Sequence, residues 1–412
     1  MFPADLLAER RRAKLAAMQG VRAVRRPVTP GAEDHFDLHY VRTGPVGGTP
    51  LVIIPGGPGM ASISAYQSVR RRAASLGLDV LMIEHRGVGM SRRDDSGADL
   101  PPDALTIEQV VDDVAAVLDD AGIETAVVYG ASYGTYLAAG VGVRHPARVQ
   151  AMVLDSPLLN RNDFEVVRSG CRDLLWHDDS EIAAKVRALT EAGALEPEDL
   201  TIAAAVYGLG GSGLLARHLN LLLDGRRLLW SVLRGLTLTV ARRKVPFHNE
   251  ADLVARIGFR ELNFVGTPDG RPLDTTLTWR GVPAAGTPFE AEPFDLVAEM
   301  PDFRWPTVVV SGGRDLITPM AIAERIAGLL PSDEALVRLP NAAHSMLDTR
   351  EDAAIRIIAE VAAGRAGTLP AQGEALDALP PVTSVRLMAP ALVVAAQLAA
   401  VLPRFGGKPV TS

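Results

Sequence analysis

Short apolar runs and helix-period patterns alternate along two separate parts of the chain. Residues 36–40 alternate between apolar and polar side chains, which predicts a half-exposed strand. Helices are predicted over 65–76 and, from apolar residues at helical spacing, over 107–118. Short apolar runs that predict buried strands occupy residues 51–54, 80–83, 127–129, 151–154, 307–310 and 335–339. Strands and helices alternating at this spacing predict an α/β fold, with a mostly parallel sheet covered by helices on both faces.

The pattern changes after Pro157, where residues 160–300 show helical periodicity. Amphipathic stretches lie at 181–189 and 214–236, and a glycine-containing segment at 208–213 interrupts the pattern. A block of this length is too long for a loop and predicts an inserted helical domain. The predicted division is an α/β core over 1–157, a helical cap over 158–300, a second core segment over 301–365 and a C-terminal extension over 366–412.

The composition is that of an ordinary globular protein, with 48% apolar and 22% charged residues. A length of 412 residues predicts one large domain with an insertion, or two domains. A net charge of −7 argues against a nucleic-acid partner and leaves small molecules or peptides open. The single cysteine, Cys171, excludes an internal disulfide and predicts a buried small apolar side chain. It also fits a reducing compartment, so we expect a cytoplasmic location.

Both ends of the chain carry helical patterns. Residues 1–20 are too charged for a signal peptide and predict an amphipathic leader helix. Residues 387–403 contain one polar side chain, Gln397, which predicts an apolar helix. A membrane-spanning helix needs about 20 apolar residues, whereas this segment is shorter and contains Pro390. A docked surface or dimer helix is therefore favoured over membrane contact, and the oligomeric state stays open.

The strand over 127–129 runs into the sequence Gly130-Ala131-Ser132-Tyr133-Gly134, and a helix is predicted to follow. Glycines flank Ser132 because a sharp strand-to-helix turn leaves no room for larger side chains. Such a turn lifts the hydroxyl out at the top of a sheet, at a helix N-terminus. The motif alone is a weak signal, but its setting between a strand and a helix predicts that Ser132 is a nucleophile rather than a helix cap.

A serine hydroxyl needs a base to take its proton, and the base needs an acceptor that fixes its tautomer. Asp315 and His344 each follow a predicted strand, where a doubly wound sheet places such groups. The chain order of serine, aspartate and histidine is that of an α/β-hydrolase. Asp155, also after a strand, is the rival acid. His85 follows a strand too but precedes Ser132, so we expect it to support the site rather than act as its base.

Acyl transfer also needs two hydrogen-bond donors for the negatively charged oxygen of the tetrahedral intermediate. One is predicted to be the backbone N–H of Tyr133, directly after the nucleophile. The other is expected from the Gly56-Gly57 loop after an earlier strand, where glycine lets the backbone approach a ligand. We favour Gly57 as this second donor.

Four segments resemble proline iminopeptidases and related tripeptidyl aminopeptidases, which are serine peptidases of the α/β-hydrolase fold. Residues 55–59 (PGGPG) are similar to their HGGPG loop, and residues 130–135 (GASYGT) to their GGSYGT elbow. Residues 84–91 (EHRGVGMS) resemble their DQRGxGxS segment, and residues 312–319 (GGRDLITP) their GxxDxxTP acid loop. The likeness covers about residues 36–157 and 301–365 of the chain.

The resemblance implies a helical cap over the active site and the release of N-terminal residues, often proline, from peptides. Cap carboxylates in those enzymes hold the free ammonium of the substrate, which implies this role for Glu261, with Gly56 beside the substrate. A solvated helix glutamate is the alternative for Glu261. Pro55 replaces the family's histidine, and Glu84-His85 replaces its Asp-Gln. These changes leave the serine, aspartate and histidine in place but leave the exopeptidase specificity open.

Three functions remain after this comparison. The first is an aminopeptidase that acts through an acyl-enzyme, and the second is an esterase, lactonase or amidase for a hydrophobic small molecule. The leucine-rich cap segment over 214–236 suits either substrate class. The third is a non-catalytic ligand-binding protein, against which the set of Ser132, Asp315 and His344 argues. We expect no cofactor, because neither metal-ligand spacing nor a dinucleotide fingerprint is present.

Overall fold

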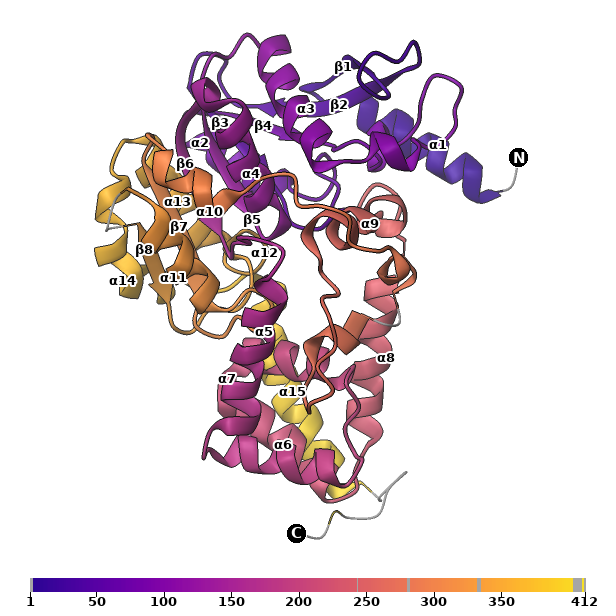
Figure 1. The fold of residues 1–412 in the computed structure, drawn as a ribbon, viewed down its shortest axis with the longest axis vertical. Helices are drawn as coiled ribbons and strands as arrows, with labels where there is room; N and C mark the ends of the chain where they lie inside the picture. The colour runs from indigo at the N-terminus through magenta and orange to yellow at the C-terminus, as the bar shows by residue number, and fades with distance from the viewer. Residues whose placement is uncertain (1–2, 243, 280–281, 332–334, 403–409, 411–412) are drawn as a thin grey trace.

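A computed structural model describes residues 3–242, 244–279, 282–331, 335–402 and 410 of the chain. A lobe built on a β-sheet lies above a helical lobe in Figure 1. The sheet has eight strands in the order β1-β2-β4-β3-β5-β6-β7-β8. β2 pairs antiparallel with β1 and β4, and the other neighbours are parallel. The strands are β1 Val21–Pro27, β2 His35–Thr43, β3 Thr49–Ile54, β4 Leu78–Ile83, β5 Ala126–Ala131, β6 Val149–Asp155, β7 Thr307–Gly312 and β8 Leu336–Leu339.

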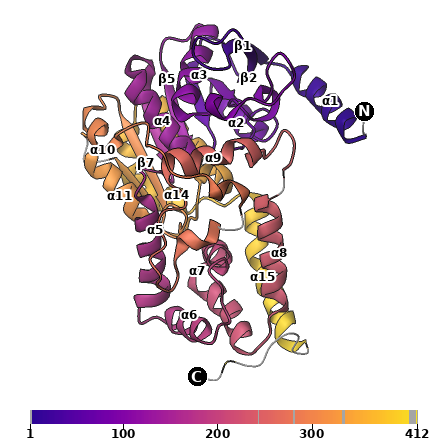
Figure 2. The ribbon, with the colours of Figure 1, turned by 45° about the vertical axis from the view of Figure 1, so that its right-hand side comes forward.

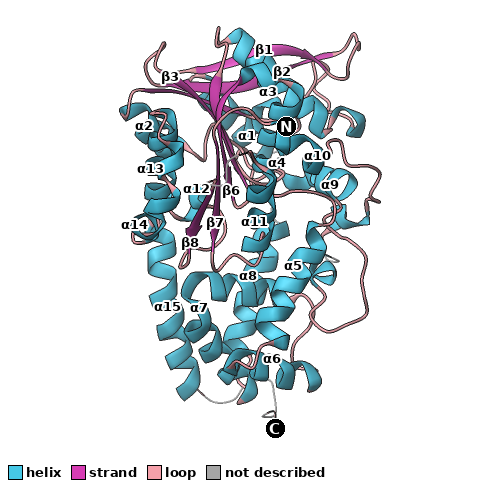
Figure 3. Ribbon diagram, turned by 60° about the vertical axis from the view of Figure 1, so that its left-hand side comes forward, coloured by secondary structure: helices cyan, strands magenta, loops and turns pink. Residues whose placement is uncertain are grey.

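Side chains of the central strands alternate between two apolar cores, one on each face of the sheet. On β3, Val52 and Ile54 belong to one core and Leu51 and Ile53 to the other. Figure 3 shows the two helical layers on either side of the sheet. The first core is completed by α3 Ile107–Asp120, α4 Tyr133–Arg144, α10 Leu296–Glu299 and α11 Met320–Leu329, and the second by α2 Gln67–Ser75, α12 Met346–Thr349, α13 Glu351–Ala362 and α14 Gly373–Asp377. The predicted α/β fold with a mostly parallel, covered sheet is confirmed.

The helical lobe has its own apolar core, to which Leu215 and Leu219 contribute as fully buried side chains. α15, in the segment expected to be a C-terminal extension, packs against this lobe through Leu392 and Val393. α9 instead packs on the core of the sheet through Val254. These helices are α5 Asp163–Arg172, α6 Glu181–Glu191, α7 Asp199–Leu223, α8 Leu228–Arg242, α9 Ala251–Leu262 and α15 Thr383–Val401; α1 Pro3–Ala16 lies at the N-terminus.

Glycine and arginine account for the differences between the predicted and observed elements. β1 was not predicted because its seven residues include three arginines and no apolar run. The break expected at 208–213 is a kink within α7, where Gly211 has φ 65° and ψ −161°. The amphipathic stretch over 214–236 is shared by α7 and α8, which are separated by residues 224–227.

A buried ion pair explains part of the segment at residues 84–91. Arg86 donates from Nε to Asp113 Oδ2 over 2.7 Å and from Nη2 to Oδ1 over 2.7 Å. Its guanidinium also lies 5.1 Å from the centre of the Phe36 ring. Both charged side chains are almost fully buried, so each compensates the desolvation of the other. This pair fixes the loop after β4 to α3, which is a structural role.

Candidate active site

Ser132 sits in a tight turn between β5 and α4. Its φ of 52° and ψ of −123° are rare for a residue with a side chain, and its hydroxyl makes no capping bond to the helix. A Cβ at Gly130 would lie 2.3 Å from the carbonyl oxygen of Gly134. A Cβ at Gly134 would lie 2.3 Å from the carbonyl oxygen of Ile54. The two flanking glycines are therefore required by backbone contact, and the turn leaves the serine hydroxyl free for another partner.

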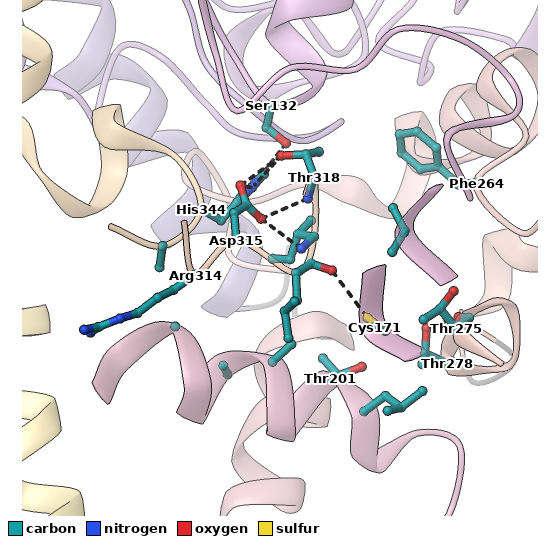
Figure 4. Close-up of a pocket in the computed structure, with 18 of the residues that line it drawn as sticks. Ser132, Cys171, Thr201, Phe264, Thr275, Thr278, Arg314, Asp315, Thr318 and His344 are labelled. Atoms are coloured by element: carbon teal, nitrogen blue, oxygen red, sulfur yellow. Dashed lines mark hydrogen bonds and ion pairs between the residues drawn. The ribbon is translucent and has the colours of Figure 1, made fainter. Parts of the chain in front are cut away.

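The structure brings Ser132, His344 and Asp315 into one hydrogen-bonded chain (Figure 4). His344 Nε2 lies 2.9 Å from Ser132 Oγ. On the other side of the ring, Nδ1 lies 2.8 Å from Asp315 Oδ2. With the ring proton on Nδ1, His344 donates to Asp315 and accepts the proton of Ser132. Residues 132, 315 and 344 thus have the arrangement that a serine nucleophile requires.

The charges of His344 and Asp315 stabilise each other. Burial alone would lower the pKa of His344, but the charge of Asp315 and its hydrogen bond outweigh burial and raise this pKa above 6.5. Burial alone would raise the pKa of Asp315, but His344 and two backbone N–H groups outweigh it and lower this pKa below 3.8. Asp315 is therefore ionised at neutral pH and stabilises a protonated imidazole.

The loop after β7 holds Asp315 in place. Asp315 Oδ1 accepts the backbone N–H groups of Ile317 at 2.8 Å and Thr318 at 2.9 Å. The Thr318 hydroxyl donates to Asp315 Oδ2 over 2.9 Å and lies 3.2 Å from His344 Nδ1. We did not single out Thr318 from the sequence, although it belongs to the GGRDLITP segment that resembles the family's acid loop.

The rival acid, Asp155, is buried but hydrogen-bonds elsewhere. Its Oδ2 accepts the hydroxyl of Tyr129 over 2.8 Å and the backbone N–H of Leu347 over 3.0 Å. His85 is also buried, and burial lowers its pKa to about 4. His85 is not among the residues that line the cavity of Ser132. The structure therefore shows no contact through which His85 would support the site, as the sequence had led us to expect.

The loop after β3 lies directly beside the nucleophile. A Cβ at Gly56 would lie 3.2 Å from Ser132 Cβ, so this position accommodates no larger side chain without movement. Gly57 lines the same cavity as Ser132 and has φ 142°. Tyr133 begins α4, where a first-turn N–H has no partner within its own helix. Gly57 thus lines the cavity of Ser132, and Tyr133 directly follows Ser132 at the start of α4. Their assignment as the two oxyanion donors stays a prediction.

Ser132 and His344 open into a cavity of about 810 Å³ between the two lobes. Its walls are mostly apolar and come from α5, α7, α8 and α15 as well as from the loops of the sheet. Apolar lining residues include Leu158, Phe164, Val167, Leu209, Leu262 and Met388. Among the described residues, no group of three or more histidine, cysteine or acidic side chains is arranged to hold a metal ion.

Glu261 does not line this cavity, so the structure does not place it where the resemblance implied. Its Oε2 accepts the backbone N–H of Ile107, the first residue of α3, over 2.8 Å. Its Oε1 pairs with the guanidinium of Arg260. The side chain is buried, and the glutamate therefore stabilises a helix start rather than facing either substrate or solvent.

Asp163 lines the cavity and was not singled out from the sequence. Its Oδ2 accepts the N–H groups of Leu159 at 2.6 Å and Asn160 at 3.1 Å. Its Oδ1 is buried and has no hydrogen-bond partner among the described residues. Burial raises the pKa of Asp163 to about 7.

Cys171 lines the cavity too and is buried, as the sequence predicted.

A profile of the α/β-hydrolase fold matches residues 49–169, which run from β3 through the Ser132 turn into α5. The strand order and the elbow after β5 agree with this match. This chain has the α/β-hydrolase fold. The fold and the profile match support a hydrolase. Proline iminopeptidases, which the motifs resemble, are also among the similar proteins.

The curated relatives are distant. Proline iminopeptidase from Heyndrickxia coagulans is 24% identical over 173 residues, which are 39% of this chain and 52% of that protein. A putative carbamate hydrolase, RutD, from Caulobacter vibrioides is 30% identical over 131 residues, 31% of this chain and 45% of that protein. A probable proline iminopeptidase from Leptolyngbya boryana is 24% identical over 324 residues, 76% of this chain and 86% of that protein. The first two matches thus span only about half of the relative's length.

A solved structure extends the likeness to the whole fold. The crystal structure of proline iminopeptidase from Mycobacterium smegmatis superposes with a TM-score of 0.52 at 18% identity. The match covers 84% of this chain and 99% of that one. At this identity the likeness establishes the fold and leaves the substrate to be argued from the site.

Proposed function

We propose that this protein is a serine hydrolase that works through a covalent acyl-enzyme on Ser132. The observation that supports this most strongly is the continuous chain from Ser132 Oγ through His344 to Asp315, with contacts of 2.9 and 2.8 Å. Both distances lie in the range expected of a nucleophile, its base and the group that orients the base.

In the proposed mechanism, Ser132 Oγ attacks a carbonyl carbon while His344 Nε2 takes its proton. Asp315 stabilises the imidazolium that forms, and the N–H groups of Gly57 and Tyr133 bind the oxyanion. His344 then gives the proton to the leaving group. A water molecule enters, His344 deprotonates it, and hydrolysis of the ester on Ser132 releases the acid.

We further propose that the substrate is a short peptide or amide with a free N-terminus. The motif resemblance and the similarity to proline iminopeptidases support this reaction class. Asp163 takes the ammonium-binding role that the resemblance gave to Glu261, because this residue lines the Ser132 cavity and its buried Oδ1 has no partner among the described residues. A substrate ammonium beside this carboxylate compensates its desolvation, and the carboxylate compensates that of the ammonium.

The second candidate is an esterase, lactonase or amidase for a hydrophobic small molecule. The size of the cavity, about 810 Å³, and its mostly apolar walls favour it, since such walls bind an acyl chain without needing a charged anchor. The two candidates share every step at Ser132. They differ only in whether a free ammonium contributes to binding.

Turnover of alanyl and prolyl naphthylamides, with and without N-acetylation, separates the two candidates when compared with turnover of p-nitrophenyl esters. The aminopeptidase proposal predicts that N-acetylation abolishes amide turnover. It also predicts that Asp163→Asn lowers kcat/KM for free-amine substrates by about tenfold or more, because a charged hydrogen bond is lost. The same variant should leave ester turnover nearly unchanged. Ester turnover without amide turnover would exclude the aminopeptidase and favour the second candidate.

A further inference from the structure

α8 and α15 lie side by side in the helical lobe (Figure 2). Together they expose an apolar surface. On α8 the exposed side chains follow at intervals of four residues, which puts them on one stripe of the helix. On α15 they again recur at helical spacing. These eight side chains are between 48% and 79% exposed: Leu228, Val232, Leu236, Leu387, Met388, Val394, Leu398 and Val401. We call them the α8–α15 surface.

The opposite side of α15 is docked on the protein. Leu392 and Val393 pack against the core of the helical lobe, and Ala396 is buried. α7 and α15 are both long and apolar enough to cross a membrane by length and composition. Half of the apolar window of α7 is buried within the protein, whereas only 6% of that of α15 is buried. α15 therefore lies along the helical lobe, with one side packed on the protein and its other, apolar side exposed.

The sequence around this surface is basic, although acidic residues outnumber basic ones in the chain by 49 to 42. Residues 225–249 contain six arginines or lysines and residues 378–412 contain three, and neither segment contains an acidic residue. Two of these cations pair with carboxylates, Arg234 with Glu196 and Lys244 with Asp252. Arg226 instead donates to the carbonyl oxygen of Ala399 over 3.3 Å. Two copies of so basic a region repel each other, whereas anionic lipid headgroups attract it. This charge favours a lipid surface over a second copy of the chain.

The α8–α15 surface is continuous with the cavity that contains Ser132. Arg234 and Thr237 on α8 line that cavity, as do Val385 and Met388 on α15. Met388 belongs to both, since it lines the cavity and is 48% exposed on the surface. A molecule that reaches this surface from an apolar phase is therefore next to a path of apolar side chains toward the nucleophile.

We propose that the α8–α15 surface docks on the face of an anionic lipid bilayer. α15 lies in the plane of the interface rather than across the membrane, because its other side is packed on the helical lobe. The cavity then opens toward the lipid and accepts apolar substrates from it. This docking goes beyond the proposed hydrolysis and holds whether the substrate is a peptide or an ester.

Co-sedimentation with lipid vesicles tests the proposal. The full-length protein is mixed with vesicles of phosphatidylcholine and phosphatidylserine in equal parts, or of phosphatidylcholine alone. We expect binding to the anionic vesicles, weaker binding to the neutral ones, and weakening by added salt. The double variant Leu387→Glu/Leu398→Glu should bind the anionic vesicles at least about tenfold more weakly. The matched control Val46→Glu/Leu76→Glu changes two apolar residues of the other lobe that are also more than half exposed, and it should bind like wild type.

Three further readouts make the outcomes decisive. Unfolding temperature and turnover of a soluble short-chain ester show that the double variant is folded. Ser132→Ala should bind vesicles like wild type, so loss of hydrolysis and loss of docking are separable. Equal sedimentation of wild type and double variant, or no sedimentation of either, would overturn the proposal. Light scattering that shows a wild-type dimer, a monomeric double variant and no vesicle binding would instead assign the surface to a second copy.

Discussion

Asp155 Oδ1 accepts the backbone N–H of Met346 over 3.0 Å, two residues after His344 in the chain. Asp155, the last residue of β6, and Asp315, in the loop after the neighbouring strand β7, thus contact different parts of the segment around His344. Asp315 contacts the ring of His344, while Asp155 holds the backbone that follows it. Burial raises the pKa of Asp155 to about 6, although hydrogen bonds from the backbones of Met346 and Leu347 and from the Tyr129 hydroxyl act in the opposite direction.

Exchanging each carboxylate for an amide separates these roles. Asp315→Asn should lower kcat by about 10⁴-fold, the scale known for the equivalent change in a serine protease, because the wrong tautomer of His344 is then favoured. Asp155→Asn should lower kcat far less and should mainly lower the unfolding temperature. Both are measured with a p-nitrophenyl ester and by thermal unfolding. A larger loss of kcat in Asp155→Asn than in Asp315→Asn would reverse the assignment.

The acid limb of the pH profile should reflect His344. Ser132 is activated only when His344 is neutral, so kcat/KM rises as pH increases through the pKa of this histidine. Since Asp315 raises that pKa above 6.5, the half-maximal point should lie on the alkaline side of 6.5. A profile of kcat/KM against pH with a soluble ester measures it. A flat profile from about pH 5 to 8, the range in which histidine normally titrates, would rule out His344 as the base.

Gly57 provides a test of the oxyanion donors. A Cβ at this position would lie 2.6 Å from the backbone nitrogen of Gly59, and its φ of 142° disfavours a side chain. Gly57→Ala should therefore displace the N–H and lower kcat by about 10²–10³-fold, the usual cost of one lost donor. Gly47→Ala, also at positive φ but with no atom within 4 Å, is the matched control and should keep full activity. Equal kcat for the two variants would exclude the Gly57 loop from catalysis.

Glu84 is expected to lower stability at neutral pH. Burial raises its pKa to about 8, and its Oε2 has no hydrogen-bond partner among the described residues. Between its ordinary pKa of 4.5 and 8 the folded protein keeps the proton that the unfolded chain releases, so stability falls as pH rises. Glu84→Gln should unfold at a higher temperature than wild type at pH 8 and show a smaller decline from pH 5.

The control for this prediction is Glu33→Gln, an exposed position, which should leave the pH dependence unchanged. Glutamine keeps an acceptor for the N–H of Ile63, which Glu84 Oε1 binds over 3.0 Å. A lower unfolding temperature for Glu84→Gln at pH 8 would show that the glutamate is ionised and needed in the fold.

The sheet and the Ser132 turn were predictable because they depend on local pattern. Buried parallel strands require continuous apolar runs, and the elbow requires glycines at fixed distances from Ser132. β1 escaped prediction because it is an edge strand rich in arginine, whose exposed side chains leave no apolar signal. Local pattern also indicated that Asp315 and His344 follow strands, since their loops directly follow β7 and β8.

The rest depends on contacts between distant parts of the chain. Glu261 lies on α9, and only the packing of α9 on the core of the sheet turns its carboxylate toward the start of α3. In the sequence, Asp163 is only a polar residue at the start of a helix. That its Oδ1 is buried without a hydrogen-bond partner among the described residues depends on the packing of the surrounding residues, which the local sequence does not reveal. Likewise, the apolar sequence of α15 fits a buried helix as well as an exposed one. Only the fold shows that most of this helix is exposed.

Fluorophosphonate labelling followed by intact-protein mass spectrometry shows directly whether Ser132 is a nucleophile activated by His344. We expect a single adduct on Ser132, none on Ser132→Ala, and much slower labelling of His344→Ala. No adduct on folded wild-type protein, or an adduct that persists in Ser132→Ala, would contradict it.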